Sequence, residues 1–146
     1  PADYEGALVA EENGLLGTWE LTAIVAVKEV DITKDDVQNP KKDIYVQYTD
    51  CEKDAEYTFG PGRAYEFAQG QNASNCSNKL KIEGTWKHSG DILGLIGNCS
   101  AQNLKIVFNE GKTAFTTTSN YNITDVNGLT VQTDVTFTYT KMEATD

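Results

Sequence analysis

The feature that most constrains the fold of this 146-residue chain is a Gly-x-Trp step that begins a segment of alternating apolar and polar residues. Residues 15–21 read Leu-Leu-Gly-Thr-Trp-Glu-Leu, and the step returns at residues 84–86 as Gly-Thr-Trp. A period of two is typical of a β-strand with one buried face and one wet face. A long first strand is therefore predicted from Gly17, and Ile24 breaks its alternation. The predicted drier face consists of Trp19, Leu21, Ala23, Val25 and Val27.

Further alternating segments follow, and turn-forming residues separate them. Strands are predicted over residues 44–49, 55–59, 64–68, 80–87, 92–96, 104–108, 115–121 and 129–141. The Gly-Pro-Gly-Arg sequence at residues 60–63 fits a type II turn, because Pro presets a negative φ and the following Gly accepts a positive one. The Asn127-Gly128 pair predicts a hairpin with a type I′ turn, since both residues tolerate a positive φ.

These eight or nine strands with mostly short connections predict an all-β domain. Such a chain closes into an antiparallel up-and-down barrel or packs as a sandwich, and closure is favoured because it removes exposed edges. Residues 1–14 are interpreted as a linker that becomes a short helical turn, residues 15–142 as the barrel, and residues 143–146 as a tail.

Charge and hydropathy narrow the range of partners. The net charge of -10 and the pI near 4.5 repel phosphate groups, so neither nucleic acid nor an anionic membrane surface is an expected partner. No apolar run approaches the roughly 18 residues that a membrane-spanning helix needs. The sequence begins at Pro1 without a basic and apolar leader, and we interpret it as a mature or trimmed chain.

The cysteines constrain the cellular compartment. Cys51, Cys76 and Cys99 form an odd set, which allows at most one intrachain disulfide and leaves one thiol. One bridge favours an exported protein, whereas three reduced cysteines would indicate a cytosolic one. Export is the interpretation we favour, and the spacing alone leaves the alternative open.

Several of these motifs together resemble the bacterial lipocalin-like domains that are common in exported lipoproteins of Bacteroidetes. The resemblance covers about residues 15–142. The shared motifs are the Gly-x-Trp start, the Asp-Cys-Glu-Lys-Asp step at residues 50–54 before residues 57–59, Cys76 before the second Gly-x-Trp step, and the closing pattern of residues 135–141. The resemblance implies a lipocalin-like barrel in the periplasm, in an outer-membrane lipoprotein or at the cell surface. Membrane association would come only through a lipid anchor upstream of Pro1.

The resemblance also implies structural roles for particular residues. In similar domains the Trp of the first strand packs near a basic residue of the last strand, which here would place Lys141 beside Trp19. Cys51 and Cys76 stand at the positions of disulfide candidates. The family more often has Arg at the position of Lys141, so a contact with Trp19 would involve a compact charge. Cys99 has no counterpart in the pattern and is either a buried small residue or an alternative partner for Cys76.

No catalytic residue, metal site or cofactor is predicted. His88 is interpreted as an exposed turn residue, because a hairpin tip supplies neither a nucleophile nor an orienting acid. The acidic stretch from Asp31 resembles the start of a calcium loop, but it has Asp36 where Gly is needed and Lys42 where a bidentate Glu is needed. A wet strand face is predicted for Glu52, Asp54 and Glu56. We therefore expect a protein that is not an enzyme.

The aromatic residues form the one set with functional promise. An eight-stranded barrel is either filled by side chains or holds one small ligand, and rings with hydroxyl tips suit a partly polar cavity. Trp19 and Trp86 are predicted to be buried structural residues of the barrel core. The predicted interior set is Tyr48, Tyr57, Phe59, Tyr65, Phe67, Phe115, Tyr121, Phe137 and Tyr139.

Two hypotheses of function follow. In the first, the protein binds a small hydrophobic molecule inside the barrel without a covalent step. In the second, the aromatic set is plain core packing, and a solid barrel acts as a structural or protein-interaction module of the bacterial cell envelope with an unknown protein partner.

Overall fold

The computed structural model describes residues 4–33, 40–71, 73–98 and 100–142. These ranges contain three short helical turns, namely η1 (Ala10–Leu15), η2 (Tyr45–Gln47) and α1 (Asp50–Lys53). The strands are β1 (Gly17–Val30), β2 (Lys41–Asp43), β3 (Glu56–Phe59), β4 (Ala64–Gln69), β5 (Leu80–Ser89), β6 (Ile92–Gly97), β7 (Ser100–Phe108), β8 (Ala114–Thr124) and β9 (Thr130–Lys141). Within the described residues, no helix is long and apolar enough to cross a membrane.

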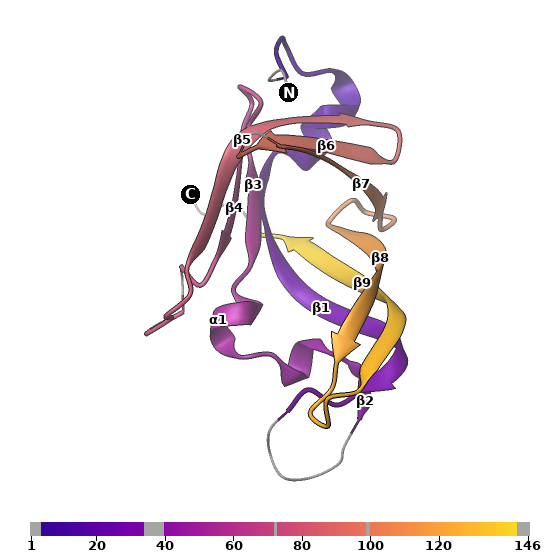
Figure 1. Cartoon of the computed structure of the whole chain (residues 1–146). Coiled ribbons are helices and arrows are strands. Elements are labelled where there is room, and N and C mark those ends of the chain that lie inside the picture. The colour runs from indigo at the N-terminus through magenta and orange to yellow at the C-terminus, as the bar shows by residue number, and fades with distance from the viewer. Residues whose placement is uncertain (1–3, 34–39, 72, 99, 143–146) are drawn as a thin grey trace.

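The structure confirms the predicted all-β barrel. The nine strands form one antiparallel sheet in the order β2-β1-β3-β4-β5-β6-β7-β8-β9, and a further pairing between β1 and β9 closes it (Figure 1). Eight strands make up the closed barrel, and β2 is an extra strand beside β1. The predicted N-terminal helical turn is η1, which lies at one end of the barrel, whereas η2 and α1 lie at the other. We refer to these as the η1 end and the α1 end.

Strand β1 closes the barrel because both of its edges are paired. Residues 17–20 pair with β3 on one side, and residues 19–26 pair with β9 on the other. The far end of β1 instead carries β2. A single long strand therefore joins the first and last parts of the barrel.

The prediction that Val25 and Val27 belong to the dry face is wrong, because a β-bulge interrupts β1. The register between β1 and β9 shifts at Thr22, which is an extra residue on the β1 side. An extra residue reverses which face each later side chain occupies. Val25 and Val27 are consequently 48% and 66% exposed, whereas Ile24 and Ala26 are buried.

The strand predicted for residues 44–49 is also wrong, because the chain forms η2 there. The Gln47 side chain supplies the physical reason. Its amide oxygen accepts a hydrogen bond from the Ile32 N–H (2.9 Å), and its amide nitrogen donates to the Val30 carbonyl (3.0 Å). These bonds hold the segment against the end of β1, so its backbone closes a short turn there instead of joining a strand ladder.

The wet strand face predicted for Glu52, Asp54 and Glu56 does not form as a unit, since α1 occupies residues 50–53. The Thr49 backbone N–H and hydroxyl donate to the Glu52 carboxylate at 3.2 and 3.0 Å. This arrangement is a capping box, which satisfies free backbone groups at a helix start. Only Glu56 of the three acids lies in a strand.

Both predicted hairpins form, but the predicted turn types are wrong. In the β3–β4 turn the positive φ belongs to Arg63 (68°) and not to Gly62. In the β8–β9 turn Gly128 has the positive φ (84°) and Asn127 does not. A type I turn followed by one left-handed residue accounts for both. A left-handed arginine is unusual, and the contacts of its guanidinium explain how it is held.

A buried ion pair fastens the η1 end of the barrel. The two terminal nitrogens of Arg63 donate to the two carboxylate oxygens of Glu12 at 2.8 and 2.9 Å. Both side chains are almost completely buried. Such a bidentate pair is among the stronger hydrogen-bonded arrangements in proteins.

The remaining hydrogen-bonding groups of this pair are also satisfied. The Arg63 guanidinium donates to three backbone carbonyls, those of Gly6, Ala7 and Trp86, at 3.0–3.1 Å. The Glu12 carboxylate accepts from two backbone N–H groups, those of Val9 and His88, at 2.9 Å each. The pair thereby joins the N-terminal segment, η1, the β3–β4 turn and β5 into one unit.

Aromatic side chains fill the interior beside this ion pair. Trp19 and Trp86 are fully buried, and both indole N–H groups donate to backbone carbonyls, at 2.8 and 3.0 Å. The ring of Trp19 lies 5.1 Å from that of Phe115 and 6.1 Å from that of Phe108, and the ring of Trp86 lies 5.3 Å from that of Phe59. The η1 end is therefore a packed core.

This packing predicts a large stability loss for Trp19→Ala. Removing a buried Trp side chain leaves a void, and we expect the free energy of unfolding to fall by about 3–5 kcal/mol in urea titrations. Val27→Ala is the matched control on the same strand, and its effect should stay within about 0.5 kcal/mol. A Trp19→Ala loss below about 1 kcal/mol would contradict the structural role of the indole.

The ion pair predicts a stability loss in acid. Burial alone would raise the pKa of Glu12, but the hydrogen bonds from Arg63, His88 and Val9 and the Arg63 charge outweigh it and lower the pKa from 4.5 to about 2. Because the folded pKa is the lower one, the stabilisation is complete above about pH 4.5 and is lost as the pH falls towards 2. We expect this loss to be about 3 kcal/mol in urea titrations.

The control for the acid prediction is Glu12→Gln, which has no proton to gain at this position. Its stability should change less between pH 4.5 and 2 than that of the unsubstituted protein. Parallel stability curves for the two proteins over this range would show that the ion pair is not the source of the acid dependence.

Candidate ligand-binding interior

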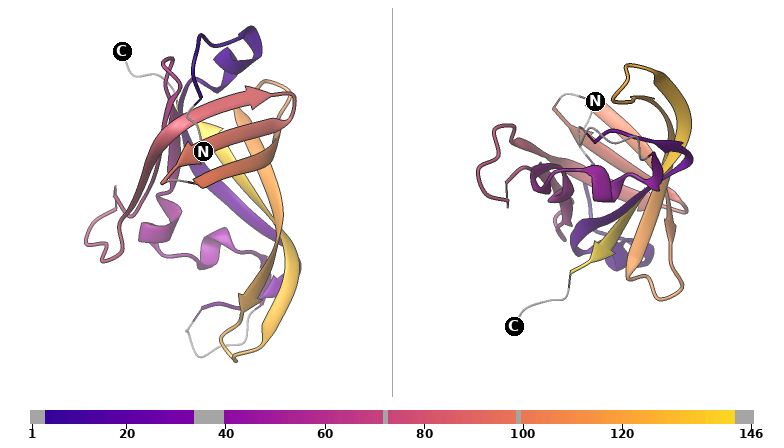
Figure 2. Two further views of the ribbon diagram at one scale, coloured as in Figure 1. Left: turned by 45° about the horizontal axis from the view of Figure 1, so that its top comes forward. Right: turned by 90° about the horizontal axis from the view of Figure 1, so that it is seen from below.

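Towards the α1 end the barrel wall is less continuous. Strands β7 and β8 pair only over residues 106–108 and 115–117. Among the described residues, the first part of β7 pairs only with β6, and residues 118–124 of β8 pair only with β9. The β8–β9 hairpin therefore extends beyond β7 together with the far end of β1 and β2, and the segment with η2 and α1 runs across this end (Figures 1 and 2).

A series of aromatic rings leads from the packed η1 end towards the α1 end. The ring of Phe115 stacks on that of Tyr139 with centroids 5.4 Å apart. Tyr139 meets Tyr57 edge-on at 5.1 Å, and Tyr57 lies 4.8 Å from Phe67. Three of these rings come from β3, β4 and β9, so the series crosses the interior of the barrel.

Three tyrosines of the barrel interior carry hydroxyl groups that need hydrogen-bond partners. Among the described residues, no hydrogen bond to the hydroxyl of Tyr57, Tyr65 or Tyr139 is present, although Tyr65 and Tyr139 are each only 6% exposed. Within the described residues, two buried polar side-chain atoms have neither a hydrogen-bond partner nor contact with solvent. They are the two ring nitrogens of His88. The hydroxyl oxygens of the three tyrosines are not among these atoms, so each of them retains some contact with solvent.

The electrostatic environment keeps these hydroxyls protonated. Burial is the main factor that raises the pKa of Tyr57 and of Tyr139, and interactions with other tyrosines, including Tyr121, raise both further. Burial also raises the pKa of Tyr48 and of Tyr65. Each hydroxyl consequently offers both a donor and an acceptor at neutral pH.

The structure divides the predicted aromatic set between two regions. Phe59 and Phe115 are fully buried core residues at the η1 end, packed on the two tryptophans. Five further residues of β3, β4 and β9 continue from this core along the barrel: Tyr65 and Tyr139 are buried members of the same core cluster, and Tyr57, Phe67 and Phe137 are partly buried and pack against it. Tyr48 follows η2, and Tyr121 lies on the projecting part of β8, where its ring is 5.7 Å from that of Phe137.

The predicted contact between the first and last strands has the expected geometry. Lys141 lies opposite Trp19 in the β1–β9 pairing, and its Nζ is 5.5 Å from the centroid of the indole ring. This distance is within the range of a cation–π interaction. The contact belongs to the structural part of the barrel.

The interpretation of His88 as an exposed turn residue is wrong. Strand β5 continues through Ser89, and alternation from Trp86 places His88 on the inner face, where it is only 4% exposed. Its ring packs edge-on against Phe108 at 5.7 Å, and neither ring nitrogen has a partner. The period-two pattern from Leu80 to Trp86 could have found this position if the strand had been extended by one more pair.

A disulfide ties down the segment at the α1 end. Cys51 of α1 is bonded to Cys76 with an S–S distance of 2.01 Å, so the pairing implied by the family resemblance is present. The Asp54 carboxylate accepts hydrogen bonds from the backbone N–H groups of Gly70 and Ala73 and so holds the same loop. Because Cys76 is bonded to Cys51, the alternative pairing of Cys76 with Cys99 is wrong, whereas Cys99 itself and the calcium-loop residue Asp36 lie outside the described residues.

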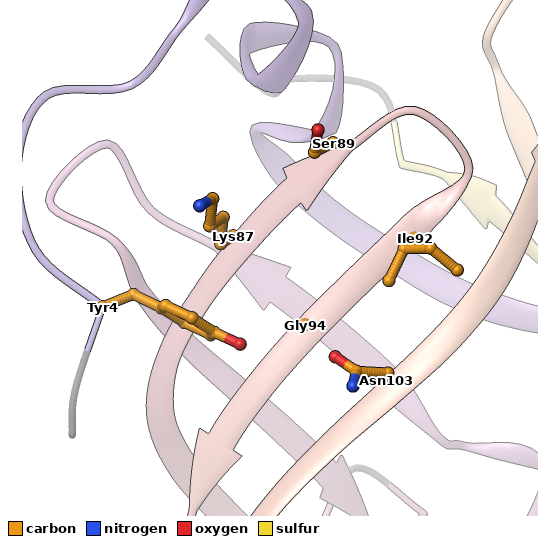
Figure 3. A pocket seen from close by; sticks show the side chains of 6 residues that line it. All are labelled: Tyr4, Lys87, Ser89, Ile92, Gly94 and Asn103. Atoms are coloured by element: carbon orange, nitrogen blue, oxygen red, sulfur yellow. The ribbon is translucent and has the colours of Figure 1, made fainter. Parts of the chain in front are cut away.

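The outer surface carries a small hollow at the N-terminal segment (Figure 3). Its volume is about 150 Å³, and it is lined by Tyr4, Lys87, Ser89, Ile92, Gly94 and Asn103. The Tyr4 ring covers Gly94, where a side chain would collide with the Tyr4 hydroxyl, and the Tyr4 N–H donates to Thr85 (3.0 Å). The hollow thus marks where the N-terminal segment is laid over β5 and β6.

Across the described ranges, no group of three or more His, Cys, Asp or Glu side chains is arranged to hold a metal ion.

The fold and the interior define a lipocalin-like β-barrel whose inner tyrosines are only partly satisfied. The chain belongs to the family of the DUF5004 domain, a domain of unknown function, whose model matches residues 1–142. No curated protein and no solved structure matches the chain. The family match does not address the resemblance to lipocalin-like lipoproteins, which stays a prediction.

The disulfide predicts a measurable stability contribution at the α1 end. Cys51 and Cys76 are separated by 25 residues, and closing such a loop is worth about 3 kcal/mol in the chain-entropy account. We expect the Cys51→Ser/Cys76→Ser double variant to lose roughly this amount in urea titrations. In addition, thiol titration of unreduced, denatured protein should find a single reactive thiol, and three reactive thiols would contradict the bridge.

Proposed function

We propose that the protein binds a small hydrophobic molecule inside its barrel, without a covalent step. The observation that carries this proposal is the group of unpartnered tyrosine hydroxyls on largely buried side chains. These hydroxyls retain contact with solvent, and a bound molecule that displaced this solvent could supply hydrogen-bond partners in its place. The surrounding aromatic rings would contribute apolar contact at about 25 cal/mol per Å² of buried surface.

A binding role without catalysis agrees with the arrangement of the polar side chains. His88 is the one histidine of the chain, and its ring is sealed in the packed η1 end. The Glu12 carboxylate is occupied by Arg63 and by backbone N–H groups. Neither residue is available as a general base for a molecule held near the inner tyrosines.

We further propose that the protein acts outside the cytosol, in the periplasm or at the cell surface of a bacterium. A Cys51–Cys76 disulfide is compatible with an oxidising compartment. A lipid anchor upstream of Pro1 would be its means of membrane association.

The second candidate function is a protein-interaction module of the bacterial cell envelope. Residues 118–124 of β8 favour it, because this stretch contains no charged residue and pairs on one side only within the described chain. An uncharged free strand edge is a site at which another strand can add. A barrel that takes up no small molecule would favour this function.

Dye titration tests the proposed binding function. We expect the neutral dye Nile red to bind one molecule per chain with a saturable rise in fluorescence. Phe137→Ala should weaken the dye about fivefold or more, because it removes an inner aromatic ring, as expected for about 1 kcal/mol of lost contact. The control is Val107→Ala, since Val107 is exposed on β7 and should leave the affinity unchanged.

Native mass spectrometry supplies the complementary measurement. Protein purified from its own host should carry an extra small-molecule mass that mild organic extraction removes. A bare mass before extraction, together with no saturable dye binding, would contradict the proposed function and favour the interaction module.

A further inference from the structure

We infer that the molecule bound in the barrel is uncharged, and that it combines a flat apolar ring system with oxygen atoms able to hydrogen-bond to Tyr57 and Tyr139. This inference rests on the proposed function and specifies the chemical class of its ligand.

The first step concerns the two hydroxyls. The rings of Tyr57 and Tyr139 meet edge-on with centroids 5.1 Å apart, so their side chains occupy one region of the interior. Neither hydroxyl has a protein partner among the described residues. A ligand that covered them with hydrocarbon alone would leave two polar groups buried and unpaired, which is costly. A ligand with carbonyl or hydroxyl oxygen atoms satisfies them.

The second step concerns charge. The buried charged side chains of the described chain are Glu12, Asp31 and Arg63. Glu12 and Arg63 neutralise each other at the η1 end, and the Asp31 carboxylate accepts hydrogen bonds from Thr33. The Lys141 ammonium lies over the Trp19 ring. Hence none of the buried charged side chains of the described residues is in place to compensate a charge on a ligand beside Tyr57 and Tyr139.

The third step concerns shape. Tyr57 contacts Phe67, Phe59 and Tyr139 through ring contacts at 4.8, 5.7 and 5.1 Å. Aromatic side chains favour stacked or edge-on contact with other rings, so a flat ring gains more from this cluster than a flexible chain of equal area. Tyr121 and Phe137 extend the same aromatic lining towards the α1 end. The site therefore selects for a ring with polar oxygen at its edge.

Four naphthalene probes test this inference by equilibrium dialysis at neutral pH. They share one ring system and differ in one substituent: naphthalene, the neutral ketone 2-acetonaphthone, the anion 2-naphthoate and the cation 2-naphthylmethylammonium. We expect the ketone to bind about tenfold more tightly than naphthalene, which equals about 1.4 kcal/mol, and the two ions to bind more weakly than the ketone by at least that factor.

The variants Tyr57→Phe and Tyr139→Phe remove one hydroxyl each and keep the ring. Each should weaken the ketone about five- to tenfold and leave naphthalene within about twofold. Tyr4→Phe is the control, since Tyr4 lies on the outer surface (Figure 3). Thermal unfolding checks that each variant is folded before its affinity is compared.

The outcomes separate the ligand class from the proposed function. If none of the four probes nor Nile red binds, the binding function itself is wrong. If naphthalene binds as tightly as the ketone and both tyrosine variants bind the two probes as the unsubstituted protein does, the barrel binds ligands but the inferred class is wrong. Tighter binding of the cation than of the ketone would also overturn the inference, because it would show that the aromatic faces select charge.

Discussion

The bidentate contact between Glu12 and Arg63 is the interaction on which the η1 end depends. It links a helical turn near the N-terminus to a hairpin turn more than a third of the chain away, and it also holds the backbone of β5. Removing both charges from water is costly, and the cost is offset only when every donor and acceptor has a partner. Here the surrounding carbonyl and N–H groups provide those partners. The unusual left-handed backbone of Arg63 persists because the guanidinium is fixed in this way.

The two halves of the interior differ in how their polar groups are satisfied. Beside the contact between Glu12 and Arg63, Trp19 and Trp86 pack against phenylalanine rings and their indole N–H groups are satisfied, so that region is occupied by protein alone. Further along the barrel, tyrosine takes the place of phenylalanine and tryptophan, and the hydroxyls of Tyr57, Tyr65 and Tyr139 have no protein partner among the residues that the structure describes. The first region contributes tight packing to the stability of the fold. In the second region, the tyrosine hydroxyls could still form hydrogen bonds that the folded protein does not make.

Much of the fold could be predicted from the sequence, because period-two patterning persists through most strands. Strand β9 follows the predicted alternation from Val131 to Lys141 without interruption, and the Asn127-Gly128 pair marked its hairpin. The bulge at Thr22 could not be predicted, since no local preference fixes an extra residue and only the register with β9 reveals it. Residues 49–52 contain a helix-start signal, Thr-x-x-Glu, and in the structure this signal prevails over the strand patterning around it.

The candidate site was less predictable than the fold. The aromatic residues could be identified, but the sequence could not separate fully buried Phe115 from Tyr139, its direct partner on the neighbouring strand, because both lie on the apolar face of an alternating segment. Burial of His88 was missed because a strand end and a turn have similar composition. The unpaired state of the Tyr57 hydroxyl depends on what surrounds it in space, and no sequence pattern encodes that.

The N-terminal segment laid across β5 and β6 has a mechanical consequence. A pulling force applied ahead of Tyr4 would load the ring seated over Gly94 and the Thr85 contact first, and then the carbonyls of Gly6 and Ala7 that Arg63 holds. Tension would thus be absorbed by the packed half of the molecule. The aromatic half near α1 lies at the other end of the barrel, so a pulling force on the N-terminal segment would leave its shape unchanged.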